Sequence, residues 1–555
     1  MLQGFDRFAP KNERNDKFIA LVRKKAEKMV GTPIYDLPFS EFLKFYETGS
    51  RVEYEELYME HRKRLWHFAA MALYEDDPVW VRELSDTISA ICGEPVWTFP
   101  AHVSEDASFK EMRDRIDLFA AETSEALAET VYLLGDRLPK HIVDMVKFNI
   151  EERIVEPFIN VDQGYPKNNW QAVCNGCVAI TLMELSFTEA FEKTKDRIVE
   201  GLNIFLDSYP DDGICLEGPL YWAYGFGYFV YAAAMLREYT AGEIDLLSSE
   251  KVENIASFYE YAFVSGEYTV PFADAGHILY LNPGLVSFLH REYGTPMISE
   301  QSAMKYGFDL RWHLADMTRN LFWSLDFVEK QTVTYEEFFP DAEWYYNRKD
   351  KYTLVAKGGY NDEPHNHNDI GSFVVFSDGK YIVDDLGWPE YDKEYFNPEQ
   401  RYKNYICATS LGHSVPIVNG EAQLYGKDKS CRVIESKNGT FAIDISGAYG
   451  LSEGSVLRTL RCYEDSIKLT DAVSGGNTLV SRVALRIKPR ICDGRVFVGG
   501  SVIEADISCK ISLSEQVFET RYSVAVSDTE RFVTAYFVDF IPTEAASKIQ
   551  LTIKV

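Results

Sequence analysis

Hydrophobic and polar residues follow two different periods along the chain, one in each half. In "RIDLFAAETSEALAETVYLLG", apolar residues from Ile116 to Leu134 recur at steps of three and four, which is the pattern of an amphipathic helix. Gly135 can end that helix, and Pro139 opens a second apolar run that reaches Ile150. Short connections that carry Pro or Gly favour antiparallel helical hairpins. Similar runs cover residues 54–74, 78–92, 176–207, 219–240 and 250–264.

From about residue 335 the pattern changes to that of short strands. "GSFVVFSDGKYIVDD" predicts a hairpin that turns at Asp378-Gly379, because Asp-Gly is a favoured two-residue turn. "RVIESKNGTFAIDISGAYG" predicts another, which turns at Asn438-Gly439, and β-rich runs continue to "KIQLTIKV" at the end of the chain. We therefore predict a helical domain at residues 1–330 and an antiparallel β-sandwich at residues 331–555.

The composition is that of a globular protein large enough for more than one domain. The chain has 555 residues, 46% of them hydrophobic and 26% charged. Its formal net charge of -29 argues against nonspecific binding to nucleic acid or anionic membranes, since both require a basic surface. A polyanionic substrate would therefore need a local basic pocket.

Features of the termini and cysteines predict a cytoplasmic protein. The first residues contain no apolar core of a signal peptide, and no stretch reaches the ~18 apolar residues of a membrane span. Nine scattered cysteines, an odd number, suit free thiols in a reducing compartment. Cys174 and Cys177 form a lone C-x-x-C, for which buried thiols are a better explanation than zinc or redox chemistry.

Two of the ten histidines lie in "HNHND", directly before a predicted strand. His365 and His367 could bind a metal, transfer protons, do one of each, or cap the strand. If the turn at Asp378-Gly379 has two residues, Asp384 lies opposite Phe373, and both histidines share its face if the strand runs straight back. At ~3.3 Å per residue, the chain would also have to bend to bring them together.

A further histidine, His413 in "SLGHSVPIVNG", lies on another segment of the β half. Two histidines and one carboxylate from different strands would make a normal zinc site with an open position. The alternative, which spacing alone favours, is that each histidine is a hydrogen-bonded polar group at a strand end.

Two stretches of the helical half also carry polar or aromatic clusters. In "KNNWQAVCNGC", Asn168 and Asn169 precede Trp170; they could cap a helix or donate amide hydrogen bonds to a substrate carboxylate. In "DGICLEGPLYWAYGFGYF", four rings crowd the start of a helix, as core residues or as a sugar platform with a phenol available for proton transfer. They are Tyr221, Trp222, Tyr224 and Tyr228.

Taken together, these stretches resemble the heparinase II/III family of polysaccharide lyases and its alginate-lyase relatives. The H-x-H-x-D block, followed by a strand, an aspartate and a later histidine, is the most specific part. The resemblance covers most of the chain and implies an incomplete (α/α) toroid followed by an antiparallel β-sandwich. It is carried by the order of "WTFPAH", "DLFAAETSEALAETVYLL", "NNWQAVCNG", "EGPLYWAYG", "HNHNDIGSFVVFSDGKYIVDDLG", "FNPEQRYKNY" and "GHSVPIVNG".

The resemblance assigns catalysis to one histidine of this motif and zinc binding to the other. It places His365 in the catalytic cleft, and it implies that His367, Asp384 and His413 hold a zinc ion that braces the sandwich. Asp385 is a neighbour that could replace Asp384 as ligand.

The family's chemistry is β-elimination at a uronic acid, which needs a neutralised carboxylate, a base for the C5 proton and an acid for the C4 oxygen. The resemblance makes Asn169 the neutralising group and Tyr221 the acid, with the role of base also open to Tyr221. His365 is better poised as base near neutral pH. Tyr224 is a rival to Tyr221, and Trp170 stands where close relatives often have a histidine. The expected substrate-binding residues are Asn168, Asn175, Trp170, Trp222, Tyr224 and Arg401.

Two other functions stay open at this point. A glycoside hydrolase on a helical toroid would need two carboxyl groups, for which Asp211, Asp212 and Glu217 are candidates. A glycan-binding protein that kept a lyase fold without its chemistry is the other. Lyase action on short, acidic oligosaccharides, from their ends, fits the sequence best, and a homodimer is common among proteins of this type.

Overall fold

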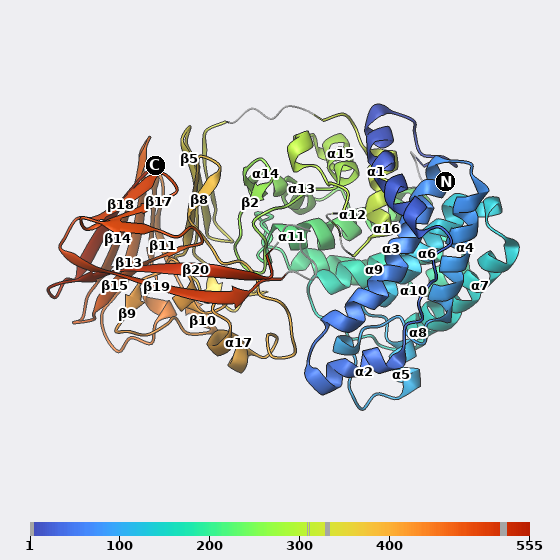
Figure 1. Ribbon diagram of the computed structural model, residues 1–555, viewed down its shortest axis with the longest axis horizontal. Coiled ribbons are helices and arrows are strands. Elements are labelled where there is room, and N and C mark those ends of the chain that lie inside the picture. Colours follow the sequence, from blue (N-terminus) through green and yellow to red (C-terminus); the bar gives the residue numbers. More distant parts are fainter. Residues whose placement is uncertain (1–4, 308, 310, 328–332, 364, 522–529) are drawn as a thin grey trace.

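The computed structural model describes residues 5–307, 309, 311–327, 333–363, 365–521 and 530–555. Helices occupy the first part of the chain and antiparallel sheets the second, side by side along the long axis of the molecule (Figure 1). The helices of the first part are α1 (Glu13–Met29), α2 (Phe39–Thr48), α3 (Val52–Tyr74), α4 (Pro78–Gly93), α5 (Phe109–Asp114), α6 (Leu118–Leu134), α7 (Lys140–Ile150), α8 (Glu156–Asn160), α9 (Asn169–Glu184), α10 (Thr188–Asp207), α11 (Pro219–Tyr221), α12 (Gly227–Tyr239), α13 (Glu250–Ser257), α14 (Tyr259–Ala262), α15 (Pro283–Tyr293) and α16 (Leu314–Trp323).

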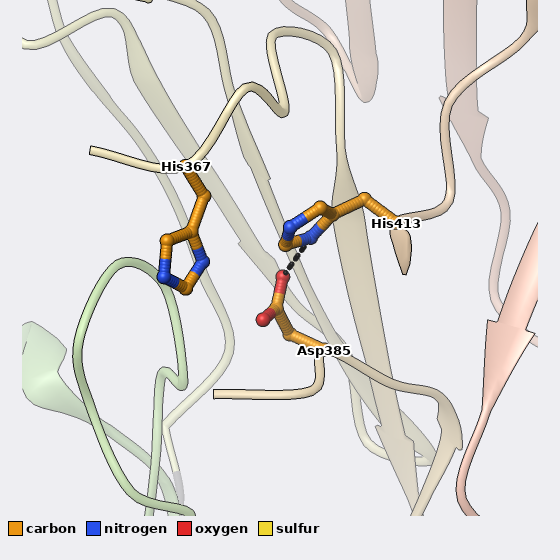
Figure 2. Close-up of side chains that lie close together, drawn as sticks. All are labelled: His367, Asp385 and His413. Atoms are coloured by element: carbon orange, nitrogen blue, oxygen red, sulfur yellow. Dashed lines mark hydrogen bonds and ion pairs between the residues drawn. The ribbon is translucent and has the colours of Figure 1, made fainter. Parts of the chain in front are cut away.

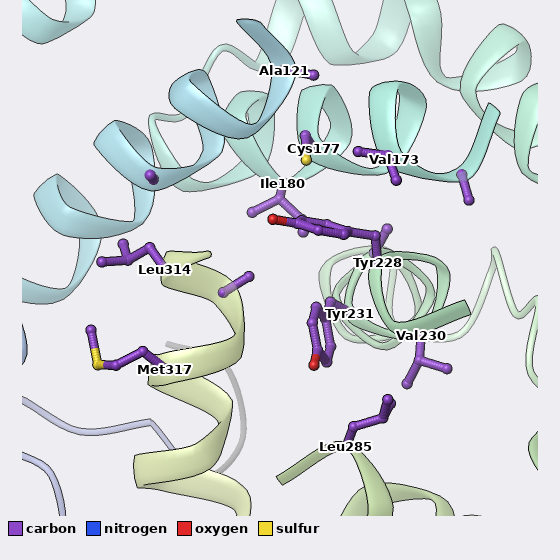
Figure 3. Packing of buried hydrophobic residues seen from close by; sticks show 14 of the residues in the cluster. Ala121, Val173, Cys177, Ile180, Tyr228, Val230, Tyr231, Leu285, Leu314 and Met317 are labelled. Carbon is purple, nitrogen blue, oxygen red and sulfur yellow. The ribbon is translucent and has the colours of Figure 1, made fainter. Parts of the chain in front are cut away.

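The core of the helical half surrounds α9, which is buried along nearly its whole length. A helix that is apolar on all sides belongs in the centre of a bundle. Figure 3 shows Cys177 and Ile180 of α9 facing Tyr228 of α12, with Leu314 of α16 nearby. The predicted helices at 54–74 and 78–92 are confirmed as α3 and α4. The predicted run 176–207 is two helices, because the chain reverses at Ser186, which has a left-handed φ of 60°.

In the described residues, the second part of the chain contains a two-stranded sheet of β6 (Tyr360–Asn361) and β10 (Gly426–Ser430) and three larger sheets. Their strand orders are β3-β4-β5-β7-β8, β19-β20-β15-β9 and β11-β12-β13-β14-β21-β18-β17-β16. The strands are β3 (Tyr335–Phe339), β4 (Trp344–Arg348), β5 (Tyr352–Lys357), β7 (Phe373–Ser377), β8 (Lys380–Val383), β9 (Ile417–Val418), β11 (Arg432–Lys437), β12 (Thr440–Asp444), β13 (Val456–Cys462), β14 (Ser466–Val473), β15 (Leu479–Leu485), β16 (Arg490–Cys492), β17 (Arg495–Val498), β18 (Ser501–Ala505), β19 (Cys509–Glu519), β20 (Phe532–Pro542) and β21 (Lys548–Lys554).

The five-stranded sheet lies between the two hydrophobic cores. On β4, Trp344 and Tyr346 pack with the core of the helical half, while Tyr345 packs with that of the sandwich. Neighbouring residues of a strand point to opposite faces, so one strand contributes to both cores. Arg348 adds polar contacts, since its Nη2 donates to the carbonyl oxygens of Phe263 and Val264 at 2.7 and 2.8 Å. The two halves are therefore held together by packing as well as by the chain.

Both predicted hairpin turns are confirmed. Asp378 and Gly379 join β7 to β8, and Asn438 and Gly439 join β11 to β12. All four residues have positive φ, between 49° and 72°, which matches the twist of the flanking strands.

The β7–β8 hairpin contains a bulge that the sequence did not reveal. Ser377 pairs with Lys380 as expected, but the register shifts so that Val375 faces Val383. Continued by two residues, this register puts Asp385, rather than Asp384, opposite Phe373. A bulge inserts one residue and so exchanges the faces of everything beyond it.

The predicted boundary between residues 330 and 331 lies outside the described residues and stays a prediction. In the described part, α16 ends at Trp323 and β3 begins at Tyr335. Among the helices that the structure describes, none combines the length and hydrophobicity needed to cross a membrane.

Candidate active site

A cavity of about 450 Å³ lies where the two halves meet. The helical half contributes Tyr221 and Tyr224 to its walls, and the sandwich contributes Trp388, Arg486 and Arg521. Arg311 adds a third guanidinium, alongside the carboxylates of Asp309, Asp316 and Glu530. Three arginines and three carboxylates thus share these walls. On a chain of net charge -29, the cavity offers cationic groups to an acidic substrate without being positive as a whole.

Tyr221 ends the short helix α11 and touches both halves. Its hydroxyl lies 3.1 Å from that of Tyr391, and its ring stacks on His365 with 4.3 Å between centroids. Burial, assisted by the negative charge of Asp274, raises the pKa of Tyr221 to about 12. The phenol therefore keeps its proton near neutral pH and is suited to donate it.

The buried carboxylate of Asp274, on a loop of the helical half, organises this region. Its Oδ2 lies 2.6 Å from Nδ1 of His365, and its Oδ1 lies 3.1 Å from Nε2 of His367. Burial opposes its ionisation, but Arg401 and the two histidines outweigh that effect and hold the pKa of Asp274 well below its usual range. Tyr391 donates to it at 2.6 Å, and Tyr395 donates as well.

The ionised state of Asp274 decides how His365 is protonated. A carboxylate only accepts hydrogen bonds, so Nδ1 of His365 must carry the proton that points at it. In the neutral ring, the lone pair then lies on Nε2, which is 3.7 Å from Oε2 of Glu217. Of the two ring nitrogens of His365, Nε2 is thus the one available to act as a base.

His367, Asp385 and His413 form a buried cluster in which one donor atom of each lies within 4.8 Å of the others. Figure 2 shows a ring nitrogen of His367 turned toward Asp385 and His413. This nitrogen is Nδ1, which has no hydrogen-bond partner among the described residues. The other nitrogen, Nε2, is bonded to Asp274. Nε2 of His413 donates to the carbonyl of Cys407 at 2.7 Å. Its Nδ1 faces a second acceptor, Asp385, at 2.9 Å, and would release its proton on binding a metal.

This donor set fits a zinc ion. Two neutral imidazole nitrogens and one carboxylate are common zinc ligands, and each histidine has an oxygen acceptor behind it, which orients ligating histidines in metal sites. Asp384, which we expected as the ligand, lies outside the cluster. Its carboxylate instead lies 2.7 Å from Nε2 of His277, because the β7–β8 bulge turns Asp385 toward the histidines.

The predicted asparagines lie at the start of α9, away from the main cavity. Asn168 caps the helix by accepting from the backbone N–H of Trp170 at 3.1 Å. Asn169 lines a separate cavity of about 20 Å³ with Glu217 and Tyr221, which is room for about one water molecule. Asn175 donates to the carbonyl of Gln171 within its own helix.

The predicted aromatic and basic residues have mixed positions. Trp222 is fully buried and donates to the carbonyl of Ile255, so it is a core residue and not a sugar platform. Trp170 packs on His102, 4.8 Å between centroids. Tyr224 lines the cavity, but its hydroxyl donates to Glu122. Arg401 is buried, with Nη2 3.5 Å from Asp274.

The carboxylates considered for hydrolysis do not form a pair. The side chain of Asp211 is 88% exposed and lies beside Lys251. Asp212 accepts from the backbone N–H groups of Asp341 and Ala342. Only Glu217 lies beside Tyr221.

Asp274 and Tyr391 were missed by sequence reasoning. Asp274 is separated from His365 by 91 positions, and neither Asp274 nor Tyr391 belongs to a motif with recognisable spacing. The only signal in the sequence was the local richness in tyrosine.

One family model matches a part of the second half, and solved structures match the fold of the whole chain. Residues 332–510 match the family model described as heparinase II/III-like, C-terminal. No curated protein sequence matches the chain. A heparan sulfate lyase HepC mutant from Pedobacter heparinus has a TM-score of 0.60 and 15% identity, over 99% of this chain and 84% of that one.

Two other solved structures have similar scores. Heparinase III has a TM-score of 0.61 and 12% identity, over 98% of this chain and 92% of that one. Chondroitin AC lyase of Streptomyces coelicolor A3, in complex with chondroitin sulphate, has a TM-score of 0.58 and 10% identity, over 99% of this chain and 80% of that one. The predicted fold class, a helical toroid followed by an antiparallel β-sandwich, is confirmed.

Proposed function

We propose that this protein, whose residues 332–510 form a heparinase II/III-like C-terminal domain, is a polysaccharide lyase that cleaves uronic-acid-containing glycans by β-elimination. The observation that carries the proposal is the contact between a protonated phenol and an oriented imidazole. Tyr221 stacks on His365, which Asp274 holds with Nε2 available. An acid and a base in contact at the junction of two halves suit a reaction that moves two protons.

Each residue has one task in the proposed reaction. Nε2 of His365 takes the C5 proton, which the adjacent carboxylate acidifies, and the electron pair forms the C4–C5 double bond as the C4–O bond breaks. Tyr221 gives its proton to the leaving C4 oxygen. Asn169, which lines a small cavity with Tyr221, hydrogen-bonds the carboxylate and stabilises the enolate-like charge.

Zinc is the metal that we propose for the cluster of His367, Asp385 and His413. When bound, it would brace the sandwich residues beside the cleft rather than activate water. His367 and His365 share Asp274, so an ordered His367 also supports the position of the base.

The substrates that we propose are short acidic oligosaccharides, cleaved from their ends in the cytoplasm. All nine cysteines are free thiols, which is the expected state in a reducing compartment. A homodimer stays a prediction.

Ultraviolet absorbance during incubation with a panel of uronate oligosaccharides tests the proposal. We expect a rising signal from the new conjugated double bond, and a loss of about 10²–10⁴-fold in kcat for Tyr221→Phe, because the variant lacks the acidic proton. Tyr35→Phe, at a side chain that is 74% exposed, is the matched control and should behave as the native enzyme.

A flat trace on every uronate would contradict the lyase. Release of reducing sugar without a double bond would then indicate hydrolysis, and binding without turnover would indicate a glycan-binding protein. Full activity of Tyr221→Phe would reject Tyr221 as the acid.

A further inference from the structure

Arg521 is a buried arginine without an ion pair in the part of the chain that the structure describes. Its side chain is 2% exposed, and its Nε and Nη1 atoms have no hydrogen-bond partner. A buried cation is costly unless it is paired, so a guanidinium with two unpartnered nitrogens is suited to bind an anion.

The position of Arg521 points to the sugar that occupies the cleft. It lines the 450 Å³ cavity together with Tyr221 and Trp388. Its guanidinium carbon lies 3.5 Å from the ring centroid of Tyr391, whose hydroxyl is 3.1 Å from that of Tyr221. Stacking holds the guanidinium by its face and leaves its N–H edge free for hydrogen bonds in the plane.

Two other arginines near the cleft are already occupied or lie elsewhere, while Arg311, which shares the cavity wall, lies over the rings of Phe119 and Tyr224. Arg401 lies beside Asp274 and is not among the described residues that line this cavity. Arg486 lies in the cavity wall, but its Nη1 is 2.8 Å from Nδ1 of His277. Asn169 faces a space that holds about one water molecule, and its amide carries no net charge.

We propose that Arg521 is a substrate-binding residue whose free N–H edge binds the carboxylate of the uronate seated against Tyr221, while Trp388 offers its ring to the sugar. The inference rests on the proposed lyase function and names the group that recognises its acidic substrate. A guanidinium matches a carboxylate with two parallel hydrogen bonds. The positive charge of Arg521 also neutralises the carboxylate, whose negative charge would otherwise oppose removal of the C5 proton. The neutral amide of Asn169 neutralises that charge less well.

Calorimetric binding of three small, uncleavable probes tests the role of Arg521. The probes are glucuronic acid, its methyl ester and glucose 6-sulfate, applied to the full chain and to Arg521→Gln, Arg521→Lys and Arg490→Gln. Arg490 is the matched control, because it also stacks on a ring, that of Phe497 at 4.3 Å, but lies exposed on the same domain.

We expect the native protein to bind the acid more tightly than the ester, and Arg521→Gln to lose about 10–100-fold in affinity for the acid alone. Arg521→Lys should keep part of the preference, since it keeps the charge but not the fork. Arg490→Gln should keep all of it. If Arg521→Gln fails to fold, Arg521→Lys tests the same role. We expect it to lose part of its affinity for the acid and none of its affinity for the ester.

Three results would overturn the proposal. Equal weakening of acid and ester would indicate a structural role, and an unchanged preference would exclude Arg521. Tighter, Arg521-dependent binding of glucose 6-sulfate would assign the site to sulfate instead of carboxylate.

The lyase function is tested separately on the same proteins. Double-bond formation with an unchanged KM in Arg521→Gln would support the lyase function and reject the substrate-binding role of Arg521. Arg521-dependent binding of the acid, without double-bond formation on any uronate, would support the binding role of Arg521 and reject the lyase function.

Discussion

The two oxygens of Asp274 serve two histidines with different proposed roles. Oδ2 orients His365, the base, and Oδ1 orients His367, a zinc ligand. One carboxylate therefore fixes the tautomer of the base and the ligand orientation at the same time. Neither histidine can turn without losing a buried, charge-assisted hydrogen bond.

Asp274→Asn should impair both functions. The amide can accept on one side only, so one of the two histidines loses its acceptor and its tautomer. We expect kcat to fall by about 10²–10⁴-fold, as for other oriented bases, and zinc affinity by about 10–100-fold. Uronate turnover and metal analysis measure the two effects.

The control for Asp274→Asn is Asp362→Asn, at a surface aspartate that accepts from the hydroxyl of Tyr425. It should keep native turnover and zinc content. Native values in Asp274→Asn itself would show that Asp274 is not the organising residue.

The contacts of Asp274 with the two histidines could not be predicted from the sequence. The family resemblance implied different roles for His365 and His367, whereas the strand pattern alone put both on one face, provided that the strand stayed straight. In the structure β7 begins at Phe373, and His365 has a left-handed φ of 53°. The partner that separates their roles comes from 91 positions away.

At the scale of secondary-structure elements, the β7–β8 hairpin decides which aspartate can meet the histidines. The turn sequence determines the two-residue loop, and this was predicted correctly. The bulge depends on how β8 packs on its neighbours. The backbone N–H of Asp384, just after β8, donates to the carbonyl oxygen of Ala484 on β15 at 3.0 Å. A register shift of one residue costs little locally but changes the side on which each side chain lies.

Asp385→Asn and Asp384→Asn should therefore differ in zinc content. Asp385→Asn removes the anionic ligand between the histidines, so we expect about 10-fold or greater loss of zinc affinity. Asp384→Asn weakens the contact with His277, 2.7 Å away, and should retain zinc. Metal analysis after dialysis against a weak chelator compares the two variants, and a greater loss in Asp384→Asn would reject Asp385 as the ligand.

At the scale of the whole molecule, the helical half buries acidic groups that no substrate reaches. Both carboxylate oxygens of Glu125 and of Glu184 are buried and have no hydrogen-bond partner among the residues that the structure describes, while Glu129 pairs with Arg319. Burial, with the negative charge of Glu129 and Glu125, raises the pKa of Glu184 well above its usual range. The folded protein therefore holds a proton there that the unfolded chain releases near its ordinary pKa.

Stability should consequently fall as the pH rises. A pKa that is higher in the folded state contributes stability that is complete at low pH and is lost as the pH rises through the folded value. Glu184→Gln cannot ionise, so we expect its loss of thermal stability from mildly acidic to mildly alkaline pH to be smaller than that of the native protein. Melting curves followed by circular dichroism, with the exposed Glu47→Gln as control, measure this difference; equal slopes for all three proteins would contradict it.

The sequence by itself determined the features that depend on neighbours along the chain. The helical period around Leu118–Leu134, the Asp-Gly and Asn-Gly turns, and the change from helices to strands all arise from interactions within a few residues. These features were enough to predict two halves and, with the resemblance, the fold.

Only the tertiary structure decided which side chains meet in the cleft. It placed Trp222 in the core, turned Asp385 toward the histidines, and left Arg521 unpaired beside Tyr391. Each of these outcomes depends on how sheets and helices distant in sequence pack on one another. A side chain's partner across such an interface is set by packing and burial, which the local pattern of residues does not encode.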